Sequence, residues 1–159
     1  MPVAWKFGSV ASIGWEDAFV ARYSSDGALL WFRHFGAPGA LAHAVGVAAG
    51  PGGIAATGTF RTAIDFGEGP VTPAGKDDVF VVMLDPATGE TRWSATLGDA
   101  QWDRAGDVAF APDGDVVVTG EIGSKLLLAR FDGAGIEQWS KLTGYVFGSA
   151  SEWPAVSDL

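Results

Sequence analysis

An internal repeat constrains what this chain can fold into more than any other feature of its sequence. Three segments share one pattern, in which an apolar run is followed by a glycine-containing turn, a tryptophan and, five residues later, a closing glycine. These segments are residues 17–36, 78–98 and 125–144, and their aligned tryptophans are Trp31, Trp93 and Trp139. Such a repeat indicates that one supersecondary unit recurs and buries its apolar faces against its neighbours.

The segments between these copies also resemble one another. Residues 42–60 align with residues 104–122, and each contains a Thr-Gly pair at the same offset from the preceding tryptophan. Each unit therefore holds four short stretches typical of β-strands, which in the second copy are residues 79–84, 91–97, 107–111 and 115–122. A four-stranded unit of about 45 residues is the blade of a β-propeller. We therefore expect an all-β fold, a β-propeller segment of antiparallel four-stranded blades.

The repeat predicts about two complete blades with a partial blade at each end. The expected units are residues 1–16, the end of a preceding blade or an inter-blade connection; 17–60, the first blade; 61–77, an inter-blade insertion; 78–122, the second blade; and 123–159, an incomplete third blade. The second copy lacks an equivalent of residues 61–77. We therefore expect this insertion to be a hairpin or loop over one rim, outside the four-stranded blade.

The composition agrees with this fold and excludes several kinds of function. The 23 Gly and 8 Pro suit many tight turns. Nineteen acidic against ten basic residues give a net charge of -9, which repels phosphate backbones and argues against a nucleic-acid partner. The absence of cysteine excludes disulfides, thiolate metal sites and cysteine nucleophiles. No apolar run is long enough to predict a membrane span.

Six of the seven tryptophans fall into two groups. The repeated Trp31, Trp93 and Trp139 are expected to cement adjacent blades, because a buried indole removes a large apolar area from water. Three others lie in connections and are the candidate ligand-binding residues, either as stacking platforms for a sugar ring or as contacts for a partner protein: Trp15, Trp102 and Trp153. The alternative is that they have only a structural role and pack against the loops at one edge of the propeller.

The polar residues show no arrangement that predicts catalysis, a metal site or a cofactor. Asp17 and Asp78 begin their units at equivalent positions and are expected to accept backbone N–H bonds. His34 and His43, the two histidines, are not spaced as ligands on one strand face. The acidic clusters lack the spacing of a calcium loop, and no serine lies in a nucleophile-elbow context.

Two motifs carry family resemblances. The runs DFGEGPVTPAGKDDVFV (65–81) and VAFAPDGDVVVTG (108–120) resemble the bacterial seven-bladed propeller repeat (SBBP-type) family. This resemblance implies a bacterial secreted or cell-surface protein and no particular activity. The run LDPATGETRW (84–93) is similar to the tryptophan-docking motif of quinoprotein propellers, where it packs blades together and does not hold the cofactor.

The sequence therefore favours a non-catalytic scaffold that binds a protein or a carbohydrate. The alternative is part of a propeller enzyme, either quinoprotein-like or hydrolytic. A repeated His, Arg or Asp at the inner-strand entry of every blade would favour the enzyme, but Lys125 interrupts the series that Asp17 and Asp78 begin. Because propellers close with about 4–8 blades, the open faces are expected to meet the remaining blades of a longer chain or further copies of this one.

Overall fold

The computed structural model describes residues 11–144, and the regular structure in this range is entirely β-strand. The strands are β1 Ala18–Tyr23, β2 Leu29–Phe35, β3 Ala42–Gly50, β4 Gly53–Phe60, β5 Ile64–Asp65, β6 Pro70–Val71, β7 Asp78–Leu84, β8 Thr91–Leu97, β9 Arg104–Phe110, β10 Val116–Ile122, β11 Lys125–Phe131 and β12 Glu137–Thr143. The all-β prediction is confirmed. Among the described residues there is no helix that could cross a membrane.

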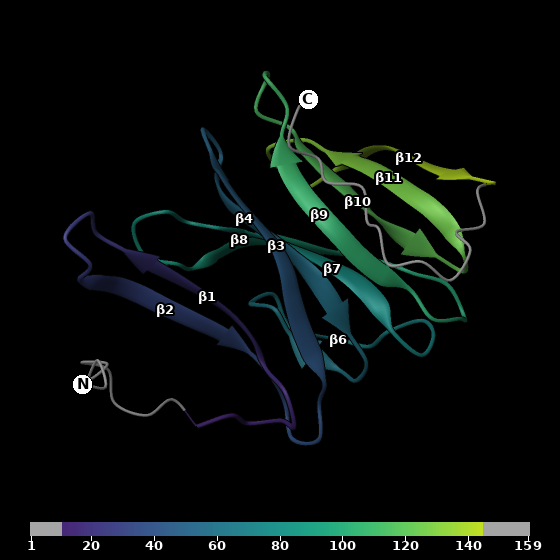
Figure 1. Cartoon of the computed structure of the whole chain (residues 1–159), viewed down its shortest axis with the longest axis horizontal. Helices are drawn as coiled ribbons and strands as arrows, with labels where there is room; N and C mark the ends of the chain where they lie inside the picture. The colour runs from purple at the N-terminus through teal and green to yellow at the C-terminus, as the bar shows by residue number, and fades with distance from the viewer. Residues whose placement is uncertain (1–10, 145–159) are drawn as a thin grey trace.

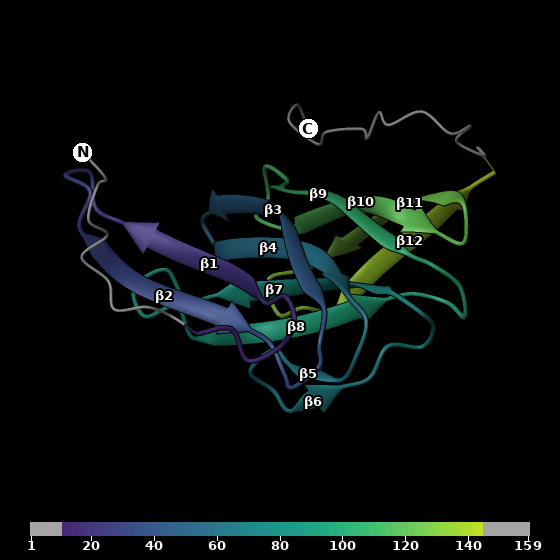
Figure 2. The same ribbon diagram turned by 60° about the horizontal axis from the view of Figure 1, so that its bottom comes forward.

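Two four-stranded antiparallel sheets make up most of the described chain. Sheet A consists of β3, β4, β7 and β8 in that order, and sheet B consists of β9, β10, β11 and β12 in that order. Strands β1 and β2 form a separate antiparallel pair, and β5 and β6 form a short hairpin. Figures 1 and 2 show the β1–β2 pair, sheet A and sheet B lying one after another across the molecule.

The sheets group the strands differently from the units expected from the sequence. Sheet A spans residues 42–97 and sheet B spans residues 104–143, so each sheet joins the second half of one expected unit to the first half of the next. A repeat fixes the period of a pattern but not the point at which one copy ends. The expected boundaries at 60 and 78 followed the long insertion, whereas β4 pairs with β7 directly across it.

The residues of the expected third unit also join an earlier sheet. Strand β11 pairs along its whole length with β10 through the tight turn at Gly123 and Ser124. Both turn residues have positive φ, 51° and 71°. Sheet B is therefore a complete four-stranded sheet, and the incomplete unit is instead the β1–β2 pair at the other end of the described chain.

The core consists of two apolar layers between these elements. Strand β7 is buried at every residue because it contributes to both layers. Phe80, Val82 and Leu84 pack against the β1–β2 pair, while Val79, Val81 and Met83 pack against sheet B. A strand buried on both faces needs no polar alternation, and this explains its continuous apolar sequence.

The insertion at 61–77 lies outside the four-stranded sheet as a hairpin, and it also contributes side chains to the core. Its residues Ile64 and Phe66 are buried in the layer between β1–β2 and sheet A. The ring of Phe66 stacks on Phe80 with a centroid separation of 4.7 Å and meets the edge of Phe60 at 5.3 Å. Figure 2 shows the hairpin below sheet A.

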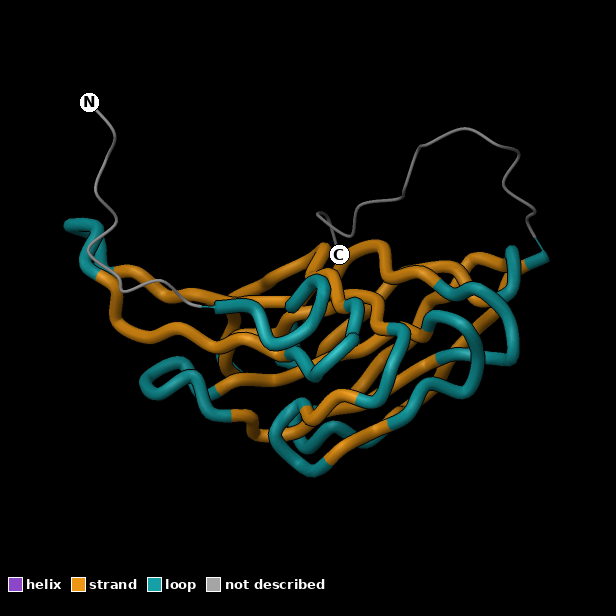
Figure 3. The backbone as a smooth tube through the Cα atoms, turned by 90° about the horizontal axis from the view of Figure 1, so that it is seen from below, coloured by secondary structure: helices purple, strands orange, loops and turns teal. Residues whose placement is uncertain are grey.

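Antiparallel strands that follow one another bring all connections to two edges of the molecule. One edge, here called the connection rim, contains the loops 12–17, 36–41, 61–77 and 98–103. The opposite edge, the turn rim, contains the short turns 24–28, 51–52, 85–90, 111–115 and 132–136. Figure 3 looks from below onto the connection rim, where the longer loops gather.

Candidate functional site

Two aspartates anchor the connection rim. Asp17 accepts hydrogen bonds from the backbone N–H groups of Ile13, at 2.7 Å, and Gly14, at 2.9 Å. Asp78 accepts the same pair of bonds from Ala74, at 2.8 Å, and Gly75, at 3.2 Å. The structure therefore places both carboxylates on the loop backbone at equivalent positions.

These bonds set the ionisation of Asp17. Partial burial disfavours its carboxylate, but the N–H groups of Ile13 and Gly14 and the hydroxyl of Ser12 outweigh burial and lower the pKa below the ordinary 3.8. The carboxylate is consequently a loop anchor that is ionised at neutral pH.

The rim loops meet in two equivalent parallel pairings. In the first, the N–H of Trp15 donates to the carbonyl of Ala40 at 2.9 Å, and Glu16 bridges to Leu41. In the second, the N–H of Lys76 donates to the carbonyl of Gln101 at 3.0 Å, and Asp77 bridges to Trp102.

Each pairing therefore contains one tryptophan. In the first pairing it lies on the loop that comes earlier in the chain, and in the second it lies on the later loop. Trp15 corresponds to Lys76, and Trp102 corresponds to Leu41. This correspondence between loops of different strands was not visible from the linear spacing of the sequence.

Trp102 is held in place by two cations. The Arg61 guanidinium lies 4.7 Å from the centroid of the Trp102 ring, and the Lys76 ammonium lies 5.2 Å from it. Arg61 is itself fixed by a two-bond pair with Asp77, at 2.6 and 3.0 Å. These contacts use the π-face of the ring, and Trp102 remains 47% exposed beside them.

Trp15 is much more open. It is 78% exposed, the highest value among the large apolar residues that the structure describes as exposed. Next to it in the chain, a Glu16 oxygen lies 3.0 Å from Nδ1 of His43, and both of these side chains are more than half exposed. A hollow of about 280 Å³ is lined by Glu16 and His43, with Phe19 among its apolar walls.

A second hollow, of about 240 Å³, brings together a serine, an aspartate and a histidine. Its lining includes Ser12, Asp17 and His34, from the first connection and β2, with Phe19 and Phe32. The hydroxyl of Ser12 donates to the carbonyl of Gly14 at 2.9 Å, and His34 Nε2 lies 3.9 Å from Asp17. In a catalytic triad the serine reaches one imidazole nitrogen and the carboxylate the other. Here Asp17 faces the nitrogen that would serve the serine, so the three residues do not form a triad.

The repeated tryptophans lie away from the connection rim. Trp31 and Trp93 are buried between successive elements, and their indole N–H groups donate to the carbonyls of Pro86, at 3.0 Å, and Gly133, at 3.2 Å. Trp139 lies on β12, at the outer edge of sheet B. Trp153 falls outside the described residues.

Residues 11–144 contain no group of three or more His, Asp or Glu side chains that could hold a metal ion. Comparison with protein-family models gives no match, and comparison with curated proteins gives none either.

Proposed function

We propose that this chain is a segment of a β-propeller that acts as a non-catalytic binding scaffold, in a bacterial secreted or cell-surface protein. The support for the propeller is the sequence repeat together with two four-stranded antiparallel sheets that pack face to face. The support for the location is the SBBP-type resemblance. Propellers place their variable loops on two rims, and binding sites are built there.

We place the binding site on the connection rim and infer that its ligand is a carbohydrate. The observation that carries this proposal is the open indole of Trp15, which is 78% exposed. A flat indole face matches the apolar C–H face of a sugar ring, and an exposed aromatic with no packing role loses free energy in water. The neighbouring Glu16 and His43 offer a carboxylate and an imidazole for sugar hydroxyls.

A carbohydrate fits this surface better than a protein does. A stable protein interface buries about 1,200–2,000 Å² in total and centres on a cluster of apolar anchors. At the connection rim, the second tryptophan is already engaged by Arg61 and Lys76. At this rim the exposed indole of Trp15 and the hollow lined by Glu16, His43 and Phe19 form an area that matches one or two sugar units.

A glycan array with three variants tests the proposal. We expect the wild-type chain to bind a small set of glycans, and Trp15→Ala to weaken that binding by roughly tenfold or more. Trp15→Phe keeps an aromatic face and is expected to retain part of it. The control is Ile136→Ala, which removes an exposed apolar side chain from the turn rim and leaves glycan binding unchanged. Absence of glycan binding, or equal binding by Trp15→Ala, contradicts the proposal.

A further inference from the structure

The same tryptophan-on-glycine contact occurs at both interfaces of the described core. The Trp31 indole lies against Gly89, and the Trp93 indole lies against Gly135. A Cβ atom added to either glycine would come within 2.7 Å of an indole carbon, so only glycine fits beneath the ring. Each tryptophan thus docks on the turn between the last two strands of the next element.

Sheet B presents the tryptophan half of a third such contact. Trp139 lies opposite Arg130 in the β11–β12 ladder, just as Trp93 lies opposite Met83 in the β7–β8 ladder. Within residues 11–144, the contact of its ring is with the Lys141 ammonium, at 5.4 Å from the ring centroid, and its indole N–H has no acceptor. In the described part of the chain, no glycine turn receives this docking side chain.

The β1–β2 pair presents the glycine half. Its turn, residues 24–28, closes with an N–H of Gly27 donating to Ser24 at 3.0 Å, as Gly135 donates to Asp132 at 3.0 Å. Gly27 has a φ of 82°, the same as Gly135, but nothing lies within 4 Å of a Cβ built on Gly27. The receiving surface is formed, and none of residues 11–144 covers it.

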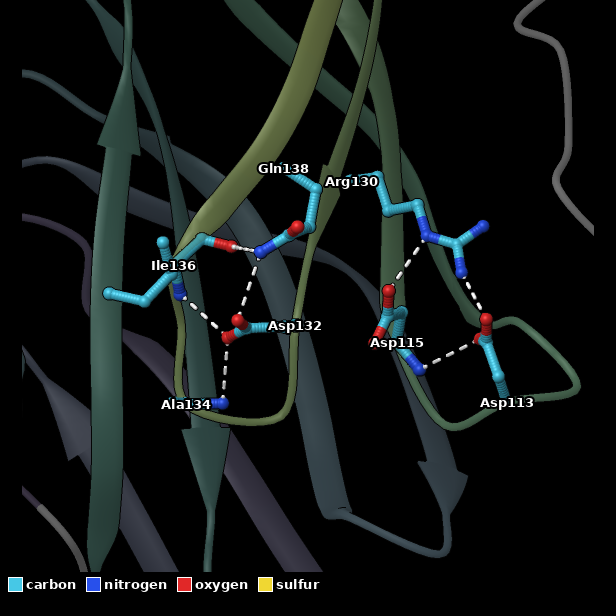
Figure 4. A network of polar contacts seen from close by, with 7 residues as sticks. All are labelled: Asp113, Asp115, Arg130, Asp132, Ala134, Ile136 and Gln138. Carbon is cyan, nitrogen blue, oxygen red and sulfur yellow. Dashed lines mark hydrogen bonds and ion pairs between the residues drawn. The ribbon is translucent and has the colours of Figure 1, made fainter.

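The turns 132–136 and 24–28 are each held in shape by hydrogen bonds to one of their own side chains. Figure 4 shows Asp132 accepting from the N–H groups of Ala134, at 2.9 Å, and Ile136, at 3.0 Å. In the β1–β2 turn, the Ser24 hydroxyl oxygen accepts the N–H of Ala28 at 2.9 Å. A turn that holds its bound shape while empty loses little conformational entropy on docking.

The surfaces around Trp139 and around the Gly27 turn are also complementary in exposed apolar area and in charge. The β1–β2 pair exposes Phe19 at 60%, although its repeat equivalent Phe80 is 1% exposed beneath the β1–β2 pair. At the first interface, the Arg33 Nε donates to the carbonyl of Gly89 at 2.8 Å. Lys141 stands at the equivalent position two residues after Trp139, and the empty turn carries the acidic Asp26 beside Gly27.

We propose that copies of this chain associate head to tail through these two halves. The Trp139 ring of one copy docks on Gly27 of the next, its indole N–H donates to the carbonyl of Ser25, and Lys141 faces the Asp26 turn. The contact is heterologous, so repeated addition produces a closed ring or an open chain of copies. The docking contact lies on the turn rim and Trp15 lies on the connection rim, so the association does not require the carbohydrate site, although Phe19 borders both surfaces.

Sedimentation velocity over a concentration series of the full chain tests the proposal by complementation. We expect the wild type to form concentration-dependent oligomers. Trp139→Ala loses the docking side chain, and Gly27→Asn places a side chain where the ring would lie. Each substitution should weaken self-association by roughly tenfold or more. An equimolar mixture of the two variants should form a heterodimer and stop there, because each variant retains one intact half.

Gly39→Asn is the matched control, because Gly39 also has a positive φ of 74° with nothing within 4 Å of its built Cβ, but it lies on the connection rim. It should assemble like the wild type. Circular dichroism of each variant confirms that it is folded, and the two independent variants keep the test valid if one of them unfolds. A wild type that stays monomeric at every soluble concentration overturns the proposal. So does oligomerisation that neither variant weakens.

Discussion

Gly58 lies directly opposite Phe80 in the ladder between β4 and β7, and the Phe80 ring occupies the space above it. A Cβ atom at Gly58 would collide with the His43 backbone carbonyl and come within 2.6 Å of the Phe80 ring. The neighbouring Thr57 hydroxyl donates to the Phe80 carbonyl at 2.8 Å. At the second Thr-Gly pair, a Cβ atom at Gly120 would collide with the Arg104 backbone carbonyl. Both pairs therefore put a glycine where the backbone of the preceding strand comes close, and at Gly58 the Phe80 ring also fills this space.

The first prediction is that Gly58→Ala destabilises the fold by about 1–3 kcal/mol, the usual cost of overpacking a filled core. Gly133→Ala is the control, since Gly133 has no positive φ and nothing within 4 Å of its built Cβ. We expect that control to stay within about 0.5 kcal/mol of the wild type. Urea unfolding followed by circular dichroism measures both, and equal midpoints for the two variants would contradict the packing argument.

The second prediction separates backbone strain from packing at the docked turns. Gly89 and Gly27 share a positive φ, 71° and 82°, but Trp31 covers only Gly89. Alanine at either position costs about 1–2 kcal/mol for the left-handed backbone. Gly89→Ala should cost about 1–3 kcal/mol more, because the methyl group displaces the Trp31 ring. Unfolding in dilute solution tests this, and similar losses for the two variants would show that the ring adapts.

The third prediction concerns the hairpin in the insertion. Phe66→Ala should destabilise the fold by about 3–5 kcal/mol, because it empties a fully buried ring position between Phe60 and Phe80. The same substitution at the exposed Phe19 should cost less than about 1 kcal/mol. Thermal and urea unfolding of both variants provide the comparison. A small loss for Phe66→Ala would mean that the hairpin is dispensable for the core.

The strands and their burial were largely predictable from the sequence, because they depend on local pattern. The continuous apolar run at 79–84 is typical of a strand buried on both faces, and every residue of β7 is buried. The grouping of strands into sheets was not predictable in the same way, because the repeat is equally periodic wherever it is divided. The pairings of β4 with β7 across the insertion and of β10 with β11 fix the division.

Equivalent residues also differ where their surroundings differ. Phe19 and Phe80 align in the repeat, but only Phe80 has another layer of strands packed over it. The rim site was predictable only in part. Trp15 and Trp102 stand out as tryptophans in loops. Arg61 and Lys76, which engage Trp102, lie near the two ends of the insertion 61–77, a different connection from that of Trp102, and no repeat period relates them to it.

The fourth prediction is an acid-sensitive contribution from Asp85. A hydrogen bond from Arg92, with further bonds from the N–H groups of Thr88 and Ala87, lowers the pKa of Asp85 from 3.8 to about 2. Since the folded-state pKa lies below the unfolded value, the stabilisation from ionised Asp85 is complete above pH 3.8 and is lost as the pH falls toward 2. NMR titration of the Asp85 carboxyl should show this pKa, and Arg92→Gln should return it toward 3.8. Lys125→Gln, which removes a distant cation, should leave it unchanged.

The fifth prediction is that the contribution of Asp103 to stability changes with pH in the opposite direction to that of Asp85. Asp103 is fully buried, and burial raises its pKa above 3.8, although the N–H groups of Asp99 and Gly123 donate to it at 2.6 and 2.9 Å. Since the folded state holds this proton more tightly than the unfolded chain does, the contribution of Asp103 to stability is largest below pH 3.8 and is lost as the pH rises through its folded-state pKa. Asp103→Asn should remove this part of the pH dependence while Asp85 keeps its own. Measuring urea midpoints from pH 2 to 7 for the wild type and both single variants, Asp103→Asn and Arg92→Gln, separates the two carboxyls. An Asp103 pKa at or below 3.8 in the NMR titration would show that the two backbone bonds outweigh burial.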